Sequence, residues 1–193
     1  MLGLKLPTDP RWVSIVEENI DEILTDHAFC EQKAATNGIS MIVNFPEYPE
    51  LVKEMIALVK EEMEHFGMVH DFILKRGGVL GRERKDTYVG ELMKFVRKGF
   101  LRHIVLIDRL LVSALIEARS CERFRLLSLN IQDKELAKFY HELMVSEATH
   151  YTMFIKLAKK YAGDEDVDAR WQQFLVYEAE VIAKYGVAET IHG

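Results

Sequence analysis

Two segments of the chain carry the same pattern of apolar and polar positions. One stripe consists of Leu51, Met55, Leu58, Glu62, His65, Val69 and Phe72, and the other of Leu136, Tyr140, Leu143, Glu147, His150, Phe154 and Leu157. Steps of three or four residues keep each stripe on one face of a helix. Each stripe contains a Glu-x-x-His pair at the same place, and both side chains of such a pair point the same way. Burying two such pairs costs several kcal/mol unless they share a positively charged partner.

The rest of the pattern predicts further helices. Asp9-Pro10 predicts a helix start, with Asp9 as N-cap, and Asn37-Gly38 predicts the end of that helix. After a connection over 39–48, we expect a second helix from Pro49 to Lys75-Arg76, ended by Gly77-Gly78. A third helix is expected from about 100 to 129, a fourth from the capping residue Asp133 to Ala162-Gly163, a fifth over about 165–185, and a short one around 87–97.

This pattern predicts an all-α fold. The chain has 193 residues with only 4 prolines and 11 glycines, which suits one compact domain and is too few turn residues for an all-β fold. Four long helices around one core, with a long crossover between the second and the third, form the ferritin-like four-helix bundle. We therefore expect a single ferritin-like domain over 1–193, with the crossover at 79–98 and an extra C-terminal helix at 164–186.

A dinuclear carboxylate site in such a bundle needs one Glu from each of the two remaining helices. In the third helix, Glu117 precedes Asn130 by nearly as many positions as Glu147 follows Asp133, so the two lie at matching depths. Glu122 would be about 9 Å off level, so we prefer Glu117. In the first helix, Glu31 lies on the apolar face, but it is less than two helical turns before Asn37. The connection would then have to travel back along the bundle.

The predicted ligands are four carboxylates and two imidazoles, namely Glu31, Glu62, His65, Glu117, Glu147 and His150. This mixed oxygen and nitrogen set fits iron or manganese better than structural zinc. A third Glu-x-x-His pair, Glu189/His192, lies in the terminal tail and is treated as accidental. Residues that could orient the ligands are His27, Glu61, Asp108, Cys121 and Ser146, although each also suits an ordinary core or surface role.

Composition adds a compartment and a local charge asymmetry. Cys30 and Cys121 have no CxxC spacing, and the chain shows neither a signal peptide nor an apolar run long enough for a membrane, so we expect a cytoplasmic protein with reduced thiols. The net charge is −6, yet residues 75–102 carry +6. Such a segment suits docking on phosphates, although a solvated loop would look the same. The candidates are Arg76, Arg82, Arg84, Lys85, Lys94, Arg97 and Lys98.

Four segments around the predicted ligands resemble a known family. They are HAFCEQKAA (27–35), EEMEHF (61–66), LIEARSCERF (115–124) and SEATHYTMF (146–154), and the resemblance runs from about residue 5 to 190. In this order and spacing they are similar to the bacterial tRNA hydroxylases that act on 2-methylthio-N6-isopentenyladenosine. The resemblance implies a non-haem di-iron monooxygenase with two Fe ions, which uses O₂ to hydroxylate the isopentenyl group next to the anticodon.

The resemblance also bears on partners. It implies tRNA as substrate and, since the sequence has no flavin, NAD or cysteine-cluster motif, a separate electron donor of reductase or ferredoxin type. We expect a monomer. The ligand pattern by itself is common to ferritin-like di-iron proteins, so a ferritin-like iron-binding or ferroxidase protein without a tRNA substrate stays open as the alternative.

Overall fold

Helices make up all of the regular structure in residues 2–83, 87–185 and 191, which are the residues that the computed structural model describes. They gather into two compact units, each described here by itself. Helices α2 (Ile20–Asn44) and α3 (Pro49–Lys75) form one unit. The other contains most of α1 (Trp12–Glu18), together with α4 (Thr87–Leu92), the 3₁₀ helix η1 (Met93–Phe95), α5 (Arg102–Asn130), α6 (Lys134–Lys160) and α7 (Val167–Tyr185).

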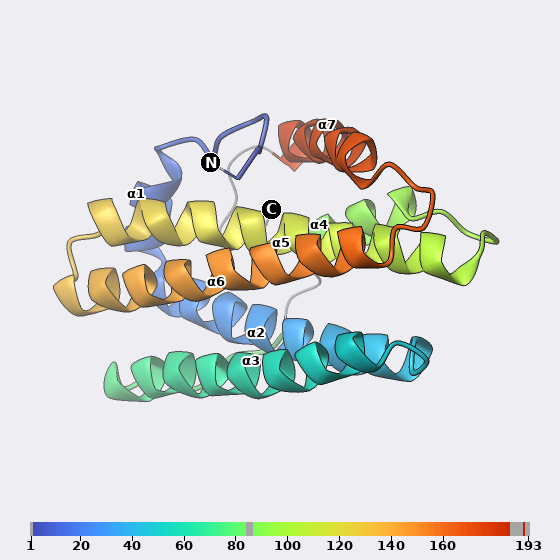
Figure 1. Ribbon diagram of the computed structural model, residues 1–193. Coiled ribbons are helices and arrows are strands. Elements are labelled where there is room, and N and C mark those ends of the chain that lie inside the picture. The colour runs from blue at the N-terminus through green and yellow to red at the C-terminus, as the bar shows by residue number, and fades with distance from the viewer. Residues whose placement is uncertain (1, 84–86, 186–190, 192–193) are drawn as a thin grey trace. The chain divides into compact units, whose positions relative to one another are not determined.

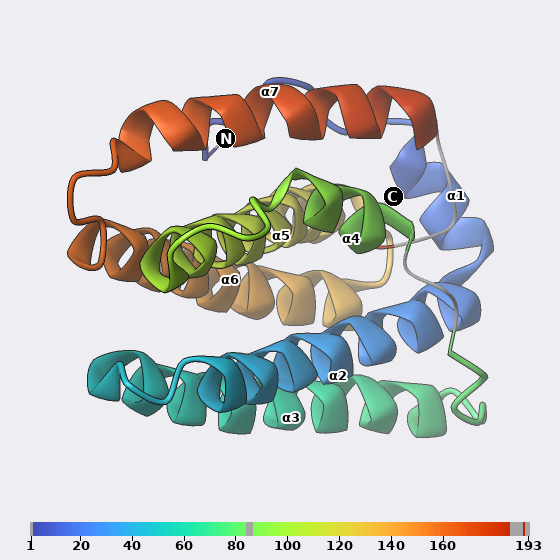
Figure 2. The same ribbon diagram turned by 90° about the vertical axis from the view of Figure 1, so that its right-hand side faces the viewer.

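In the first unit, α2 and α3 run side by side (Figures 1 and 2). The buried residues of α3 are those of the predicted stripe, except that Ile73 is buried in place of Phe72. Gly77, at φ +78°, ends α3 in the left-handed conformation that favours glycine, as predicted. The α2–α3 unit is therefore an antiparallel hairpin whose contact face includes Glu62 and His65.

The predicted stop at Asn37-Gly38 is wrong, because α2 continues to Asn44. Gly38 is buried, and a Cβ atom there would lie 2.7 Å from Cγ2 of Val59 on α3. This glycine allows two helices to approach closely and does not end one. The other end of the predicted first helix also differs, since the chain breaks at Asn19 (φ −132°, ψ 35°) into α1 and α2.

In the second unit, α5 and α6 run side by side, and α7 packs on α5 (Figure 2). Asp133 caps α6, since its Oδ1 accepts hydrogen bonds from the backbone N–H groups of Glu135 and Leu136, as predicted. All seven residues of the predicted stripe on α6 are buried. The expected crossover helix and C-terminal helix are present as α4–η1 and α7.

The helix lengths set the ligands at matching depths within each unit. Glu31 precedes Asn44, the last residue of α2, by as many positions as Glu62 follows Pro49, the first residue of α3. The longer α2 removes the mismatch that the sequence suggested, so residues 45–48 need only turn the chain. The other hairpin repeats the same spacing, from Glu117 to the end of α5 and from the start of α6 to Glu147.

Candidate metal centre

Three predicted ligands come together within the α2–α3 unit. Glu31, Glu62 and His65 are all buried, and each offers a ligand atom that lies within 4.8 Å of the others. Nδ1 of His65 lies 3.5 Å from Oε2 of Glu62 and 3.9 Å from Oε2 of Glu31. This nitrogen therefore faces both carboxylates and is the atom through which His65 could bind a metal.

Two neighbouring side chains contact this set. Nε2 of the buried His27 lies 2.7 Å from Oε1 of Glu31, one helical turn away, which leaves Oε2 on the side of His65. Oε1 of Glu61 lies 3.9 Å from Nε2 of His65, on the opposite side of the ring from Glu62. Contacts of this kind are the ones through which neighbouring side chains orient metal ligands.

The α5–α6 hairpin carries the other predicted ligands. Glu117, Glu147 and His150 are buried, at 4%, 3% and 4% exposure, and ligand atoms of Glu117 and His150 lie within 4.8 Å of each other. Cys121 lies one turn beyond Glu117 and donates its S–H to the backbone oxygen of Met144. Burial first, and then the Glu147 carboxylate, raise the pKa of Cys121 to about 11, so this residue is a protonated thiol at neutral pH in the metal-free protein.

Glu122, the alternative to Glu117, has different partners. Its carboxylate accepts hydrogen bonds from the backbone N–H and the hydroxyl of Thr8 and forms an ion pair with Arg119. Arg119 is fully buried and also binds Glu178 on α7, at 2.6 Å. Glu122 therefore helps to bind the N-terminal segment and, through Arg119, α7 to α5.

The buried cluster around Arg119 was not foreseen from the sequence. Glu178 also accepts a hydrogen bond from Tyr88 of α4, and burial raises the pKa of both Glu178 and Tyr88. The one sequence feature that pointed to this cluster was a cation, Arg119, inside an apolar helical segment. Its partner Glu178 is 59 residues away from it along the chain. The cluster ties α4, α5 and α7 together.

Asp108, expected as an orienting residue, belongs to a third cluster. Both of its oxygens accept hydrogen bonds from Arg97 and Arg170, and Arg97 also binds Glu165 at 2.8 Å. Burial alone would raise the pKa of Asp108, but the two arginines outweigh it and hold that pKa below its ordinary value. The Arg170 guanidinium lies over the Phe95 ring at 4.4 Å, so the cluster fixes the end of the crossover to α5 and α7.

The predicted phosphate-binding residues differ in their surroundings. Arg82 and Lys98 are exposed, whereas Arg84 and Lys85 lie outside the described residues. Arg76 is paired with Asp21 and Lys94 with Glu91, and Arg97 is held by Asp108 and Glu165. Of the described candidates, Arg82 and Lys98 are therefore the ones whose charges have the clearest access to a partner.

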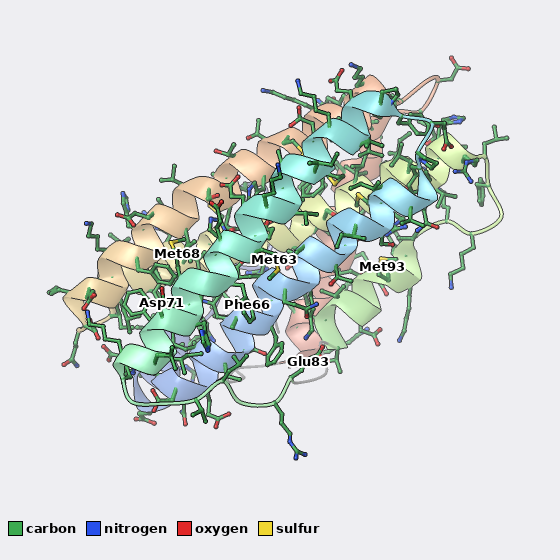
Figure 3. The ribbon with its side chains drawn as sticks, turned by 90° about the horizontal axis from the view of Figure 1, so that it is seen from below. Met63, Phe66, Met68, Asp71, Glu83 and Met93 are labelled. Atoms are coloured by element: carbon green, nitrogen blue, oxygen red, sulfur yellow. The ribbon has the colours of Figure 1, made fainter. Side chains whose placement is uncertain are left out.

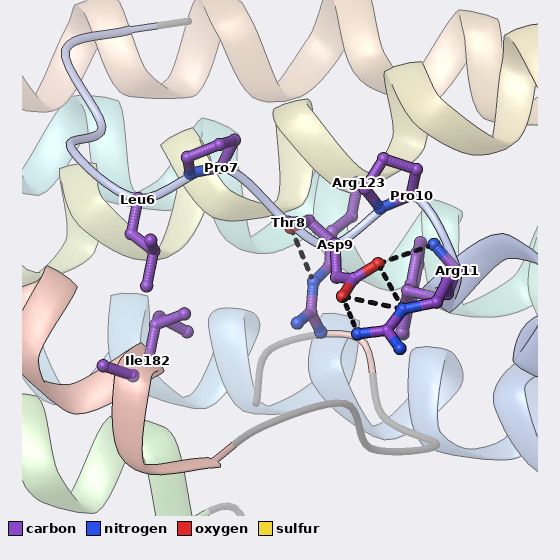
Figure 4. A pocket seen from close by; sticks show the side chains of 10 residues that line it. Leu6, Pro7, Thr8, Asp9, Pro10, Arg11, Arg123 and Ile182 are labelled. Carbon is purple, nitrogen blue, oxygen red and sulfur yellow. Dashed lines mark hydrogen bonds and ion pairs between the residues drawn. The ribbon is translucent and has the colours of Figure 1, made fainter.

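A separate pocket of about 480 Å³ lies along the N-terminal segment (Figure 4). Asp9 and Arg11 form an ion pair at its edge, and this contact lowers the pKa of Asp9 to about 2. Buried Arg123 lies over the Trp12 ring, and its Nε donates a hydrogen bond to the Thr8 hydroxyl. None of the six predicted ligands lines this pocket.

The chemistry of the donor sets fits a metal. Glu31 and Glu62 are two buried carboxylates with oxygens within 4.8 Å of each other, so their ionised forms repel unless a cation lies between them. Each hairpin contributes two carboxylates and one imidazole. Oxygen-rich sets with imidazole suit iron and manganese, and they are not the closed sulfur-rich type of structural zinc.

Comparison with known proteins gives the context of these residues. The profile of one family, described as tRNA-(MS[2]IO[6]A)-hydroxylase (MiaE), matches residues 2–193. A Pseudomonas putida protein named tRNA 2-(methylsulfanyl)-N(6)-isopentenyladenosine(37) hydroxylase is 37% identical over 164 residues, which cover 85% of this chain and 78% of that protein. A Salmonella typhimurium protein of the same name is 29% identical over 228 residues, 93% of this chain and 83% of that protein.

A solved structure supports the fold class. The Synechococcus protein 43 with aldehyde deformylating oxygenase activity has a TM-score of 0.91 and 31% identity, and the match covers 98% of this chain and 95% of that one. This likeness confirms the all-α, ferritin-like class that the sequence predicted. Within the described residues, no helix is both long enough and apolar enough to be a membrane span.

Proposed function

Because the chain belongs to the tRNA-(MS[2]IO[6]A)-hydroxylase family, we propose that it hydroxylates the isopentenyl side chain of 2-methylthio-N6-isopentenyladenosine next to the anticodon of tRNA, with O₂ as co-substrate. The observation that carries this proposal is the match of the family over residues 2–193. The buried Glu-x-x-His pairs on α3 and α6, each with a carboxylate from the neighbouring helix, supply the residues that an oxygenase of this kind requires.

We propose that both hairpins contribute to one di-iron centre. The ferritin-like ligand scheme takes one Glu from each of two helices and a Glu-x-x-His pair from each of the other two. Here the single glutamates are Glu31 and Glu117, and the pairs are Glu62/His65 and Glu147/His150. Two iron ions bound by these residues would supply the redox chemistry that O₂ activation needs, which side chains alone do not provide.

The chain's own residues prepare the site. His27 holds one oxygen of Glu31, so this glutamate can offer the other oxygen as a terminal ligand. Glu61 faces Nε2 of His65 and favours a proton on that nitrogen, which leaves Nδ1 as the lone-pair donor. The apolar residues around both pairs keep the buried ligand carboxylates out of bulk water.

Substrate and electrons come from outside the chain. The basic crossover at 79–98 is proposed to dock on tRNA phosphates, with Arg82 and Lys98 as its best placed described residues. RNA loops often turn a base outward, which would bring the prenyl group to the metal. A separate reductase or ferredoxin-type donor would supply electrons to a monomeric enzyme, acting where tRNA is matured, in the cytoplasm.

The direct test is nucleoside analysis. Reduced, iron-loaded protein is mixed with tRNA that carries the prenylated nucleoside, and O₂ is admitted. We expect a nucleoside with one added oxygen atom, formed only when iron and O₂ are both present. Untouched nucleoside from protein that holds its full iron would contradict the proposal, and iron oxidation without nucleoside change would favour the ferroxidase alternative.

A further inference from the structure

The outer face of α3 has an open hollow of about 560 Å³ beside a predicted metal ligand. All of its lining comes from α3, and His65 is the buried residue at its floor. His65 presents Nδ1 to Glu31 and Glu62, so its Nε2 side faces Glu61, which also lines the hollow. The hollow is thus a place on the described surface where a member of the ligand set is reached from outside.

Three apolar side chains line this hollow, toward its two ends. Ile56, which is 47% exposed, lies beside the exposed Ala57 in the N-terminal half, and Met68, which is 41% exposed, lies at the C-terminal end. Figure 3 shows Met68 projecting from α3, together with Met63, which does not line the hollow. Large exposed apolar side chains around a cavity favour a ligand with an apolar part, and methionine adapts its shape to such groups.

Charges divide the hollow along the helix. Lys53 and Lys60 line its N-terminal half, and within the described part of the chain neither takes part in an ion pair. Glu61 and Glu64 line the half that contains His65, where Glu61 faces the imidazole ring. Lys60 is five residues, or about 7.5 Å along the axis, from His65. An anionic group on the lysines would therefore leave an apolar substituent within reach of His65.

We propose that this hollow receives the modified adenosine, with its isopentenyl group against Met68 near His65, its methylthio group against Ile56 and Ala57, and a neighbouring phosphate on Lys53 and Lys60. The proposal rests on the proposed function and names the part of the chain that recognises the substrate. A protein partner is a poorer occupant, because stable interfaces need an apolar area much larger than three side chains provide.

Binding to two anticodon stem-loops tests the proposal. One carries 2-methylthio-N6-isopentenyladenosine and the other carries plain adenosine at the same position. Dissociation constants are measured with iron-loaded protein without O₂, so no turnover occurs. Because burial of a prenyl group removes several CH₂ equivalents from water, we expect the wild-type protein to bind the modified loop about tenfold to a hundredfold more tightly.

Two matched pairs of substitutions separate the hollow from the rest of α3. Ile56→Gln with Met68→Gln should bring the ratio of the two dissociation constants close to one, while the unmodified loop binds as before. Met63→Gln with Leu74→Gln, which also changes two exposed apolar residues of α3, should leave the ratio as in the wild type. Glutamine is as good a helix former as methionine, so all four positions tolerate the change.

Lys53→Gln with Lys60→Gln should weaken the binding of both loops by the same factor. The slope of log K against log salt concentration should fall by about 0.7 for each phosphate that the protein no longer neutralises. Iron content, measured on every variant, should equal that of the wild type.

The outcomes separate the two proposals. Three results would show that the hollow is not the substrate site. The ratio of the two dissociation constants could be unchanged in the Ile56/Met68 variant, it could fall equally in the Met63/Leu74 variant, or it could be near one in the wild-type protein. If the wild-type protein still hydroxylates the nucleoside in those cases, the proposed function stands and only this site fails. Loss of a dimer on sedimentation in the Ile56/Met68 variant, with an unchanged ratio, would assign the face to self-association and also overturn the proposal.

Discussion

At the scale of single residues, the decisive feature is the burial of acids that would otherwise repel one another. Glu62 is fully buried, and Glu31, Glu117 and Glu147 are at most 4% exposed. Buried carboxylates at this density are stable only when cations, protons or hydrogen bonds compensate them. The loss of one ligand should therefore affect metal binding far more than folding.

Glu147→Ala should reduce bound iron from two ions per chain to one or none, because a carboxylate of the α5–α6 set is lost. Glu142→Ala, on an exposed part of the same helix, is the matched control and should keep both ions. Metal analysis after reconstitution checks the result. Equal iron content in the two variants would exclude Glu147 as a ligand.

Cys121 should resist alkylation at pH 8. With a pKa of about 11, only about one thiol in a thousand is ionised at that pH, and the thiolate is the reactive form. The rate should rise about tenfold per pH unit until the pH approaches 11. Peptide mass analysis after iodoacetamide treatment of a Cys30→Ser protein measures this, and rapid labelling at pH 8 would contradict it.

At the scale of helices, close approach and ion clusters decide the arrangement inside each unit. The sequence predicted both Glu-x-x-His helices with their caps, since Asp133, Gly77 and the apolar stripes act locally. It did not predict the end of α2, because Asn37-Gly38 has the composition of a stop while Gly38 is needed for contact with Val59. The Arg119–Glu178 pair could not be predicted from the sequence either, because only the tertiary fold brings these residues together.

Gly38→Ala should destabilise the protein by about 1 kcal/mol. Overpacking against Val59 costs about 1–3 kcal/mol, and the better helix propensity of alanine offsets about 1 kcal/mol of that. In a Val59→Ala background the same change should become stabilising, because only the propensity gain remains. Urea unfolding of the four proteins gives the comparison, and a stabilising Gly38→Ala in the wild-type background would refute the close approach.

Asp108→Asn should lower the free energy of unfolding by about 3 kcal/mol at pH 7, because Arg97 and Arg170 lose their buried counter-charge. The folded pKa of Asp108 lies below the unfolded value of 3.8, so its contribution is present above pH 3.8 and is lost as the pH falls through the folded pKa. The difference from wild type should therefore shrink below pH 3.8. Asp168→Asn, which removes an exposed acid on α7, is the control for the loss of a surface carboxylate.

At the scale of the whole molecule, an acidic protein carries a basic crossover. The fold class and the burial of the six predicted ligands could be predicted from periodicity, whereas the tRNA substrate came from the family resemblance. The net charge of +6 over residues 75–102 does not show which cations are accessible, since Arg76 and Arg97 are paired with acids outside the segment. Pairing of this kind depends on the folded chain.

Arg82→Gln with Lys98→Gln should weaken tRNA binding and reduce its salt dependence by about 0.7 to 0.9 in log–log slope for each phosphate left without its cation. The turnover rate at saturating tRNA should not change, because neither residue is part of the predicted metal set. Lys134→Gln with Lys138→Gln, two exposed lysines of α6, serve as the control. If the Arg82/Lys98 variant binds tRNA as tightly as the wild type, tRNA does not dock on the basic crossover.

Each single glutamate lies as many positions before the end of its helix as the glutamate of each Glu-x-x-His pair lies after the start of its own helix. This equal spacing determines where the chain can change in length. An insertion within residues 45–48 alters only the link of the α2–α3 hairpin. One added residue between Glu31 and Asn44 would instead rotate Glu31 by about 100° and raise it by about 1.5 Å relative to the turn. Insertions and deletions should therefore be tolerated in the connections between paired helices. They should not be tolerated in the helical segments between a ligand and the connection.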